Sequence, residues 1–563
     1  MIKSCRICSA DFELTDSDLA FLKKVSPVIG GKCFEIPPPT LCYECRLRRR
    51  MAWRNDNHLY ERKCDFSGKK LISTFRPDAG VKVYDKEIWW GDQWDPLDYS
   101  RDYDFSRPFF EQFADLLKVV PNAHTAVVQG ENNLYTNYNL ANNNCYLCFA
   151  GNYLEDSLYC YNAENSRNCV DCLFVYDCEL CYQGVQLNGC YNLKYSLNSS
   201  NCSDSWFLED CEGVRDSFMC ANLRQKQYCI LNKQYPKEEY FAKLAEYRLE
   251  TNDGLSHARD LWAAERLKFP KRQLHNSSVE NCVGEYINQS KNCFDCYVIQ
   301  AGGEDLKHVF NGFPDFKDSM DCAYSGEKAA LMYETMACGA SCQGICFSNI
   351  CFINDSNILY SNFVTGSKNC FGCSNLKNQE YCILNKKYSK SEYEELLPKI
   401  IEHMKTTGEW GEYLDPKCSP FGYNETLAAQ YFPLEKEEAL EKGFNWSDFK
   451  APFPTVAKVI PANQDLPDID DVAGEIKDWA LECEISGRPF KIVKEELDFY
   501  RKYKLAVPRK HPDFRHIERL QIRNGFRLFS RNCDQCRQAI DTTYSPDAPE
   551  IVYCDKCYFA EVY

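Results

Sequence analysis

Two Cys-X-X-Cys pairs close to the end of the chain, Cys533 with Cys536 and Cys554 with Cys557, constrain its fold more than any other feature. Two thiolates on one tight turn can hold one edge of a tetrahedral metal ion, and a second such turn, one short hairpin away, can hold the opposite edge. The spacing therefore predicts a structural zinc ribbon. Four protein thiolates leave no open coordination position, so we expect this site to activate neither water nor substrate.

The two ends of the chain are related in sequence. Residues 54–89 align without a gap with residues 523–558, and twelve of these positions are identical, among them Cys64 and Cys533. Just upstream, Arg46 and Arg50 match Arg515 and Arg519. We infer that both ends derive from one ancestral module with two metal sites.

The metal ligands of this ancestral module are divided between the two copies. The N-terminal copy has Ser67, Asp85 and Ile88 where the later copy has cysteines, but it keeps a second set, Cys5, Cys8, Cys42 and Cys45. The C-terminal copy has lost that set, with Cys483, Ser486, His511 and Phe514 at the matching places. The Cys42–Cys45 pair runs directly into a basic helical stretch, which is typical of a treble-clef finger. We therefore expect two structural zinc ions, although a redox dithiol or a disulfide would also use paired cysteines.

The middle of the chain repeats cysteines at a constant interval of twenty-one positions. One series runs through Cys148, Cys169, Cys190 and Cys211, and a second series follows the same step at Cys160, Cys181 and Cys202. Asn and Gly, which favour turns, lie between them. This period predicts a parallel β-helix (β-solenoid) with one coil per repeat and the thiols stacked inside. The simplest role of these cysteines is packing, while further metal sites and disulfides are the alternatives. One tube or two tubes would fit the sequence.

The expected fold is mixed and mainly β, with a β-solenoid body and capping helices between two related zinc modules. The phrase Tyr-Cys-Ile-Leu-Asn-Lys ends both cysteine-rich stretches, at residues 228–233 and 381–386, and helical patterns follow each. We divide the chain as follows: 1–95, N-terminal zinc module, treble-clef-like with a decayed ribbon; 96–130, helical connector; 131–235, first solenoid; 236–274, capping and linking helices; 275–388, second solenoid; 389–480, capping helix and extended connector; 481–563, basic C-terminal module with the zinc ribbon.

Basic residues are concentrated at the two ends of an acidic chain. The net charge is −16, yet residues 1–70 carry fourteen Lys and Arg against nine Asp and Glu, and residues 487–531 carry thirteen against five. Arginines recur at helical spacing in both modules. One interpretation is a solvated face, or one that docks against the acidic solenoid; the other is a polyanion-binding surface that contacts RNA or DNA phosphates. The arginines concerned are Arg46, Arg49, Arg50, Arg54, Arg515, Arg519, Arg523 and Arg527.

No motif in the sequence indicates catalysis. The chain has only eight histidines, and it lacks a phosphate-binding glycine loop and a nucleophile elbow. We therefore assign no catalytic residue and leave enzymatic activity uncertain, with a non-enzyme favoured. The first residues form no signal peptide, and no stretch is long enough to span a membrane. We expect a cytoplasmic protein with reduced thiols and no membrane partner.

Several phrases resemble a family of uncharacterised cysteine-rich zinc-ribbon and β-solenoid proteins from uncultivated small-genome bacteria. They include residues 36–50, Trp94-Asp-Pro96, Ser486-Gly-Arg-Pro-Phe490 and residues 552–558. The resemblance implies a cytoplasmic metal-binding protein and carries no activity with it. The sequence as a whole favours a zinc-stabilised multidomain scaffold that binds an unknown macromolecular partner, protein or nucleic acid. The alternatives are a nucleic-acid-binding protein that uses its arginine-rich helices and, more weakly, a β-helix enzyme acting on a polymer.

Overall fold

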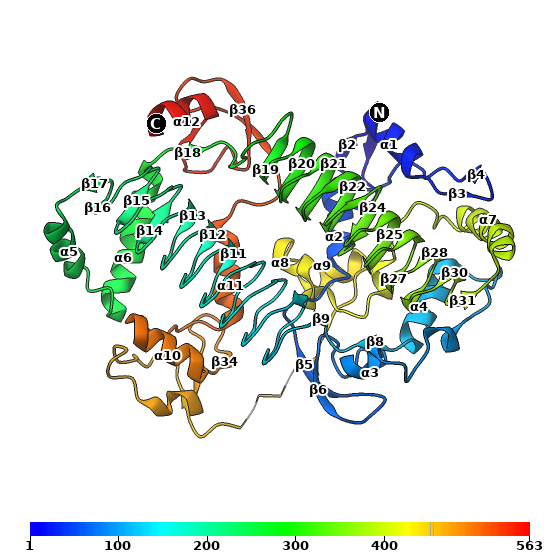
Figure 1. The fold of residues 1–563 in the computed structure, drawn as a ribbon, viewed down its shortest axis with the longest axis horizontal. Helices are drawn as coiled ribbons and strands as arrows, with labels where there is room; N and C mark the ends of the chain where they lie inside the picture. Colours follow the sequence, from blue (N-terminus) through cyan, green and yellow to red (C-terminus); the bar gives the residue numbers. More distant parts are fainter. Residues whose placement is uncertain (451, 454) are drawn as a thin grey trace.

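The computed structural model describes residues 1–450, 452, 453 and 455–563, and its fold is mixed and rich in strands. Two stacks of parallel strands form the body, and the two ends of the chain form small modules beside them (Figure 1). The strands of the two stacks belong to separate sheets. We call them the first ladder (residues 127–234) and the second ladder (residues 277–387).

The N-terminal module, residues 2–90, begins with a hairpin and a helix whose start is fixed by a capping box between Thr15 and Asp18. A connector with one helix then leads to the first ladder. The elements of module and connector are β1 (Ile2–Ser4), β2 (Asp11–Glu13), α1 (Asp16–Val25), β3 (Val28–Ile29), β4 (Lys32–Cys33), α2 (Tyr43–Met51), β5 (Tyr60–Lys63), β6 (Lys70–Ser73), β7 (Val83–Tyr84), α3 (Lys86–Trp90), η1 (Pro96–Tyr99), α4 (Phe109–Val119) and β8 (Asn122–Ala123).

The C-terminal module, residues 459–562, repeats this plan. Its hairpin pairs Phe529 with Thr542, and the N-terminal hairpin pairs Tyr60 with Ser73 at the aligned positions. The internal repeat seen in the sequence is thus also a repeat of structure. Its elements are β32 (Val459–Ile460), η5 (Gly474–Asp478), β33 (Ala480–Glu482), β34 (Pro489–Phe490), α10 (Lys494–Tyr503), α11 (Pro512–Ile522), β35 (Phe529–Asn532), β36 (Ala539–Thr542), β37 (Val552–Tyr553) and α12 (Asp555–Val562).

The first ladder advances by three residues at a time. Every third residue from Asn132 to Ala150 has a left-handed backbone with φ between 51° and 55°, which Asn tolerates better than most residues. From Cys145 to Cys220, the residue after each such position is buried. Short strands and single bridges join equivalent positions: β9 (Val127–Val128), β10 (Asn139–Leu140), β11 (Leu173–Tyr176), β12 (Val185–Asn188), β13 (Leu197–Ser200), β14 (Trp206–Glu209), β15 (Phe218–Ala221), β16 (Cys229–Ile230) and β17 (Lys233–Gln234).

The step between neighbouring strands corrects the repeat length expected from the sequence. Leu158 pairs with Val170, and Val170 pairs with Tyr182, so the chain returns to the same place after four triplets rather than the seven that the cysteine interval implied. The backbone of Cys169 likewise donates to the Ser157 hydroxyl twelve residues earlier. Cysteines seven triplets apart therefore lie on different sides of the stack. What these cysteines have in common is that each lies at one of the every-third positions whose side chains point inward.

The second ladder has longer strands and a less regular step, which is shorter between Val283 and Phe294 than between Leu306 and Ser319. Just before it, β18 (Lys271–Arg272) pairs with β37 of the C-terminal module. The strands of the second ladder are β19 (Val283–Ile287), β20 (Lys291–Ile299), β21 (Glu304–Gly312), β22 (Phe316–Ser325), β23 (Ala329–Ala330), β24 (Tyr333–Met336), β25 (Gln343–Phe352), β26 (Ser356–Leu359), β27 (Asn362–Thr365), β28 (Lys368–Phe371), β29 (Ser374–Lys377), β30 (Glu380–Ile383) and β31 (Lys386–Lys387).

Helices follow each ladder at the places where the sequence changes to a helical pattern. The first ladder leads into α5 (Lys237–Glu246), α6 (Asn252–Glu265) and η2 (Arg266–Lys268). The second leads into α7 (Lys390–Thr406), whose start is fixed by a capping box between Ser389 and Glu392. The connector after α7 contains η3 (Pro416–Cys418), η4 (Tyr423–Glu425), α8 (Leu427–Tyr431) and α9 (Lys436–Glu441).

The arginine-rich helix of each end module packs against the ladder that lies farther from it along the chain. Helix α2 contacts β22 and β24 of the second ladder, whereas α11 contacts β11 of the first. A shared apolar core joins the ladders to each other, with Leu173 and Phe174 of the first near Phe310 and Tyr324 of the second. The molecule is thus tied together crosswise.

Candidate functional site

The N-terminal module gathers four cysteines that could hold a metal ion. The sulfur atoms of Cys5, Cys8, Cys42 and Cys45 all lie within 4.8 Å of one another, and the Cys8 and Cys42 sulfurs are 3.6 Å apart. A tetrahedron with metal–sulfur bonds of about 2.3 Å has sulfur–sulfur edges of about 3.8 Å. Cys42 is the N-cap of α2 and Cys45 lies in its first turn. A hydrogen bond from the Cys45 side chain lowers the pKa of the Cys42 thiol to about 5, which favours the thiolate that metals bind.

The C-terminal module gathers a second group of four. The sulfurs of Cys533, Cys536, Cys554 and Cys557 lie within 4.8 Å of one another, with 3.7 Å between those of Cys536 and Cys554. Arg537 takes a left-handed backbone with φ 65°, as the turn around the first cysteine pair requires. Burial opposes ionisation of Cys533, but backbone N–H groups of Cys536 and Cys554 outweigh it and lower its pKa to about 6. Both cysteine quartets assemble as the sequence predicts.

The two decayed sites keep their turns without their ligands. Gly68 and Gly487 retain positive φ after Ser67 and Ser486, where a cysteine pair would end. The one remaining cysteine of each site accepts backbone hydrogen bonds: Asp85 donates to the Cys64 sulfur at 3.3 Å, and His511 donates to the Cys483 sulfur at 3.3 Å. Within the described part of the chain, the two full quartets are the metal-compatible groups.

The arginines of α2 form buried ion pairs with the second ladder. Arg46 lies 2.8 Å from Asp321, and Arg50 lies 2.7 Å from Glu334, with every one of these side chains at most 3% exposed. Arg49 reaches Glu334 at 3.2 Å and Glu412 at 2.7 Å. Removing charges from water is costly unless such partners are present, so these pairs fix α2 on the ladder.

The arginines of α11 repeat this arrangement on the first ladder. Arg519 lies 2.9 Å from Asp171, and Arg515 pairs with the other oxygen of the same carboxylate. Arg515 also reaches Glu496 at 3.3 Å. Because Arg515 and Arg519 align with Arg46 and Arg50, Asp171 takes the place that Asp321 has in the other half.

This burial contradicts the polyanion interpretation for seven of the eight arginines. Arg46, Arg49, Arg50, Arg54, Arg515, Arg519 and Arg523 are at most 7% exposed, so a phosphate backbone could not reach them on this surface. The helices are basic because they dock on acidic ladders, which is the other interpretation of the same pattern. Arg527 is exposed, and for this residue polyanion binding remains a prediction.

One arginine of each module is held between aromatic rings. The Arg54 guanidinium lies 3.9 Å from the ring centre of Tyr138 and 4.0 Å from that of Tyr324, one ring from each ladder. The aligned Arg523 lies 4.2 Å from the centre of Phe174 and 5.0 Å from that of Tyr286, again one ring from each ladder. Sequence reasoning grouped these two with the other arginines and missed the difference, because the rings come from distant repeats.

The cysteines inside the ladders behave as packing residues. The Cys160 thiol donates to the carbonyls of Leu158 at 3.5 Å and Cys169 at 3.3 Å. Ser157, at an equivalent inward position, donates to the carbonyl of Glu155 at 2.9 Å. Cysteine and serine thus occupy the same kind of site and make the same bond. Every cysteine in the described structure is a free thiol without a disulfide.

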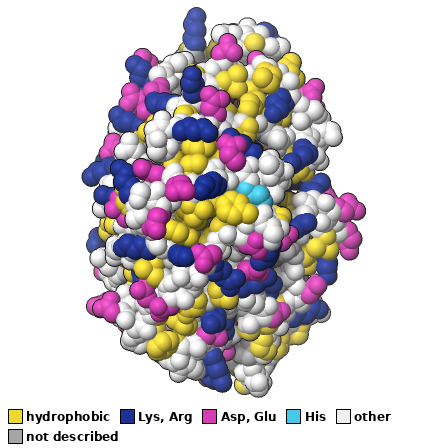
Figure 2. All heavy atoms as spheres, turned by 90° about the vertical axis from the view of Figure 1, so that its right-hand side faces the viewer, with side chains coloured by type: hydrophobic (Ala, Val, Ile, Leu, Met, Phe, Trp, Pro, Cys, Tyr) yellow, Lys and Arg dark blue, Asp and Glu magenta, His cyan; other side chains and the backbone are white. Residues whose placement is uncertain are grey.

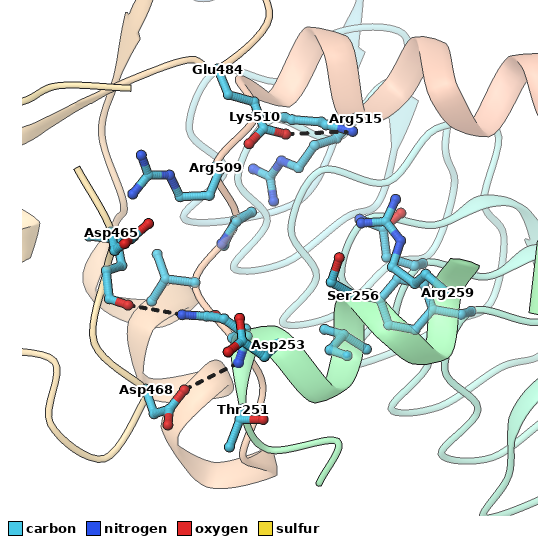
Figure 3. A pocket seen from close by; sticks show the side chains of 18 of the residues that line it. Thr251, Asp253, Ser256, Arg259, Asp465, Asp468, Glu484, Arg509, Lys510 and Arg515 are labelled. Carbon is cyan, nitrogen blue, oxygen red and sulfur yellow. Dashed lines mark hydrogen bonds and ion pairs between the residues drawn. The ribbon is translucent and has the colours of Figure 1, made fainter. Parts of the chain in front are cut away.

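A groove that the sequence did not reveal runs between α6, the first ladder and the C-terminal module. It consists of two cavities, of 610 and 730 Å³, whose walls share Tyr195, Arg259 and Lys510. We call it the α6 groove. Figure 3 shows the first cavity, with Ser256 and Arg259 on α6 and groups of both charges around the same space. Its walls come from several segments far apart in sequence, so no local motif could indicate it.

One face of the molecule mixes both signs of charge (Figure 2). On the face shown in Figure 2, Lys and Arg alternate with Asp and Glu, and apolar side chains lie between them. This face therefore offers no uniform basic patch. Within the described residues, no helix combines the length and the apolar character needed to cross a bilayer.

No protein-family model matches the chain, and no curated protein sequence is significantly similar to it. Function must therefore be inferred from the geometry of the molecule itself.

Proposed function

We propose that the two ladders are parallel β-solenoids and that the two cysteine quartets are structural zinc sites, the first treble-clef-like and the second a zinc ribbon. Parallel pairing that recurs after about four triplets supports the solenoids. A donor set of four thiolates at near-tetrahedral spacing suits Zn²⁺. When bound, zinc would supply structural cross-linking of the two turns and no catalytic chemistry. Thirty-five cysteines that form no disulfide among the described residues fit a reducing compartment, so we place the protein in the cytoplasm.

We further propose that the chain is a scaffold that binds an extended segment of a partner protein in the α6 groove. The observation that carries this proposal is the size and lining of the groove. Its two cavities of 610 and 730 Å³ share walls, so together they suit an extended occupant rather than a compact one. Tyr195 contributes an aromatic surface, and Arg259, which lies 5.7 Å from the centre of that ring, contributes a charge.

The charges of the groove favour a peptide over a nucleic acid. Lys510 lies 3.7 Å from Glu484 and also pairs with Glu518, so cations and anions alternate along the wall. A nucleic-acid backbone carries one sign of charge and would be repelled by half of these groups. A peptide can match both signs. The buried state of the arginine helices removes the main observation behind nucleic-acid binding.

A photo-crosslinking experiment in the native host tests the proposal. Benzoylphenylalanine is placed at Ser256, an exposed α6 residue that lines the groove, or at Lys399, an exposed control on α7. We expect adducts at Ser256, far fewer at Lys399, and loss of the adducts on protease but not nuclease treatment of the trapped partner. Equal labelling at both positions, or none at Ser256, would reject the groove. Adducts that nuclease removes would favour nucleic acid instead.

A further inference from the structure

Arg523 is a buried cation without an anionic partner. Its side chain is 7% exposed, and it lines the 730 Å³ cavity of the α6 groove. Its Nε atom is buried and makes no hydrogen bond, and among the described residues no carboxylate oxygen lies within ion-pair distance of its guanidinium. The six other buried arginines of the two modules discussed above all have such a carboxylate.

Arg54, the aligned residue of the N-terminal module, shows which group Arg523 lacks. Arg54 also lies between two rings, but its Nε is 2.6 Å from a carboxylate oxygen of Asp56, which is fully buried and also accepts a hydrogen bond from Tyr161. In the aligned C-terminal sequence, Arg54-Asn55-Asp56 becomes Arg523-Asn524-Gly525. The carboxylate has been replaced by hydrogen, and a cavity lies beside the arginine that lost it.

An arginine in this position remains charged, because the guanidinium is not deprotonated in proteins. Burying a charge without a partner carries a large desolvation cost, which a ligand anion would offset. The aromatic faces of Phe174 and Tyr286 flank the guanidinium and leave its planar N–H fork for an in-plane partner. A carboxylate matches such a fork with two parallel hydrogen bonds.

Nearby acidic groups do not substitute for this partner. Glu209, in the wall of the same cavity, is already paired with Arg266 at 2.7 Å and with Lys271 at 2.8 Å. These two cations hold the pKa of Glu209 to about 2 although burial opposes its ionisation. Glu209 is therefore committed to its own ion pairs.

We propose that Arg523 anchors the carboxylate of a ligand that enters the α6 groove, in the place that Asp56 fills for Arg54. The ligand class is a carboxylate attached to a flat or apolar body that can lie along the aromatic wall. An acidic side chain or a C-terminus of the partner segment has this chemistry, and so does a small organic acid. This proposal shares the α6 groove with the proposed function, and in that respect alone it rests on the proposed function.

Binding of benzoate to the full-length, metal-replete protein tests the anchor directly. Titration calorimetry measures its affinity, with uncharged benzamide as the matched control and inorganic phosphate as a second anion. We expect benzoate to bind, benzamide to bind at least tenfold more weakly, and R523Q to lose at least tenfold in benzoate affinity. Benzamide binding as tightly as benzoate, phosphate binding without benzoate, or unchanged binding by R523Q would overturn the proposal.

The variant G525D provides a second test that does not depend on R523Q folding. Nothing lies within 4 Å of a Cβ built at Gly525, so the backbone there leaves room for a side chain to begin. We expect G525D to raise the thermal midpoint in carboxylate-free buffer and to abolish benzoate binding, because the new side chain fills the place of the ligand. A midpoint that stays the same or falls would show that Arg523 lacks no partner.

The same probes separate the two sources of carboxylate and the two proposals. Crosslinking at Ser256 that persists in G525D would show that a partner occupies the groove without using Arg523. That result would reject the partner protein as the source of the carboxylate. Crosslinking lost in both R523Q and G525D assigns the carboxylate to the partner protein. Benzoate binding without any crosslinked partner supports the anchor for small acids and rejects the scaffold function.

Discussion

Replacing Asp171 with asparagine should release the C-terminal module from the first ladder. Asp171 is fully buried and accepts hydrogen bonds from Arg515 and Arg519, which are 2% and 1% exposed. Removing one partner of a buried ion pair costs about 3–5 kcal/mol, since the remaining charge is left unpaired. Two arginines lose the partner here, but Arg515 keeps Glu496 at 3.3 Å. We therefore expect a loss of about 4 kcal/mol rather than twice the single value.

Hydrogen exchange followed by mass spectrometry measures this loss locally. A chain with several modules need not unfold in one step, so the opening free energy of α11 is a better readout than a global midpoint. In D171N, amides of α11 should exchange about a thousandfold faster. The control D318N removes an exposed pair with Lys24 and should cost at most about 1 kcal/mol. If D171N and D318N change α11 exchange equally, the buried pairs do not hold the module.

Three further predictions follow from the thiols and from a buried histidine. On the proposed zinc assignment, C557S should lower the metal content from two ions per chain to one and unfold the C-terminal module, because such a site supplies roughly 10–16 kcal/mol. Elemental analysis should still find two ions in C33S, which alters an exposed thiol outside the quartets. In urea unfolding, C160S should lower the free energy of unfolding by about 1 kcal/mol or less, because a serine hydroxyl can donate the same inward hydrogen bond. C160L should lower it by about 1–3 kcal/mol, because the larger side chain overpacks the interior. Equal losses in the two variants would contradict the packing role of Cys160. His275 lies 3.0 Å from Asp210 and 2.6 Å from Glu285, and these carboxylates raise its pKa well above the usual value although burial opposes the charge. Its contribution to the free energy of unfolding should therefore be full below about pH 6.5 and fade as pH rises through the folded pKa. A difference in unfolding free energy between wild type and H275Q that instead grows from pH 6 to pH 10 would contradict this reasoning.

The parts of the fold that local sequence determines were the most predictable. The two quartets depend on short spacings such as Cys533 to Cys536, and the helix after Ser389 depends on its own cap. The internal repeat also carried over from sequence to structure, hairpin for hairpin. The coil length was wrong because cysteine marks only some inward positions. A search for apolar or small residues at every third position, including leucine, valine, serine and glycine as well as cysteine, would have found the triplet.

The properties that depend on distant contacts were not accessible from the sequence. Helical spacing shows that Arg515 and Arg519 share a face, but it does not show that Asp171, from a distant part of the chain, contacts that face. The loss of the Asp56 equivalent at Gly525 is visible in the alignment of the two ends. Its importance appears only when the cavity beside Arg523 is known.

The crosswise packing of the end modules bears on how a nascent chain matures on the ribosome. The first ladder is synthesised well before the helix that neutralises Asp171, because Arg515 follows Asp171 by 344 residues. Until that helix has emerged, the carboxylate lacks its arginine partners, and a chain that stops before residue 512 never gains them. Premature termination should therefore yield a product with an open acidic flank, which quality-control proteases can distinguish from the finished molecule.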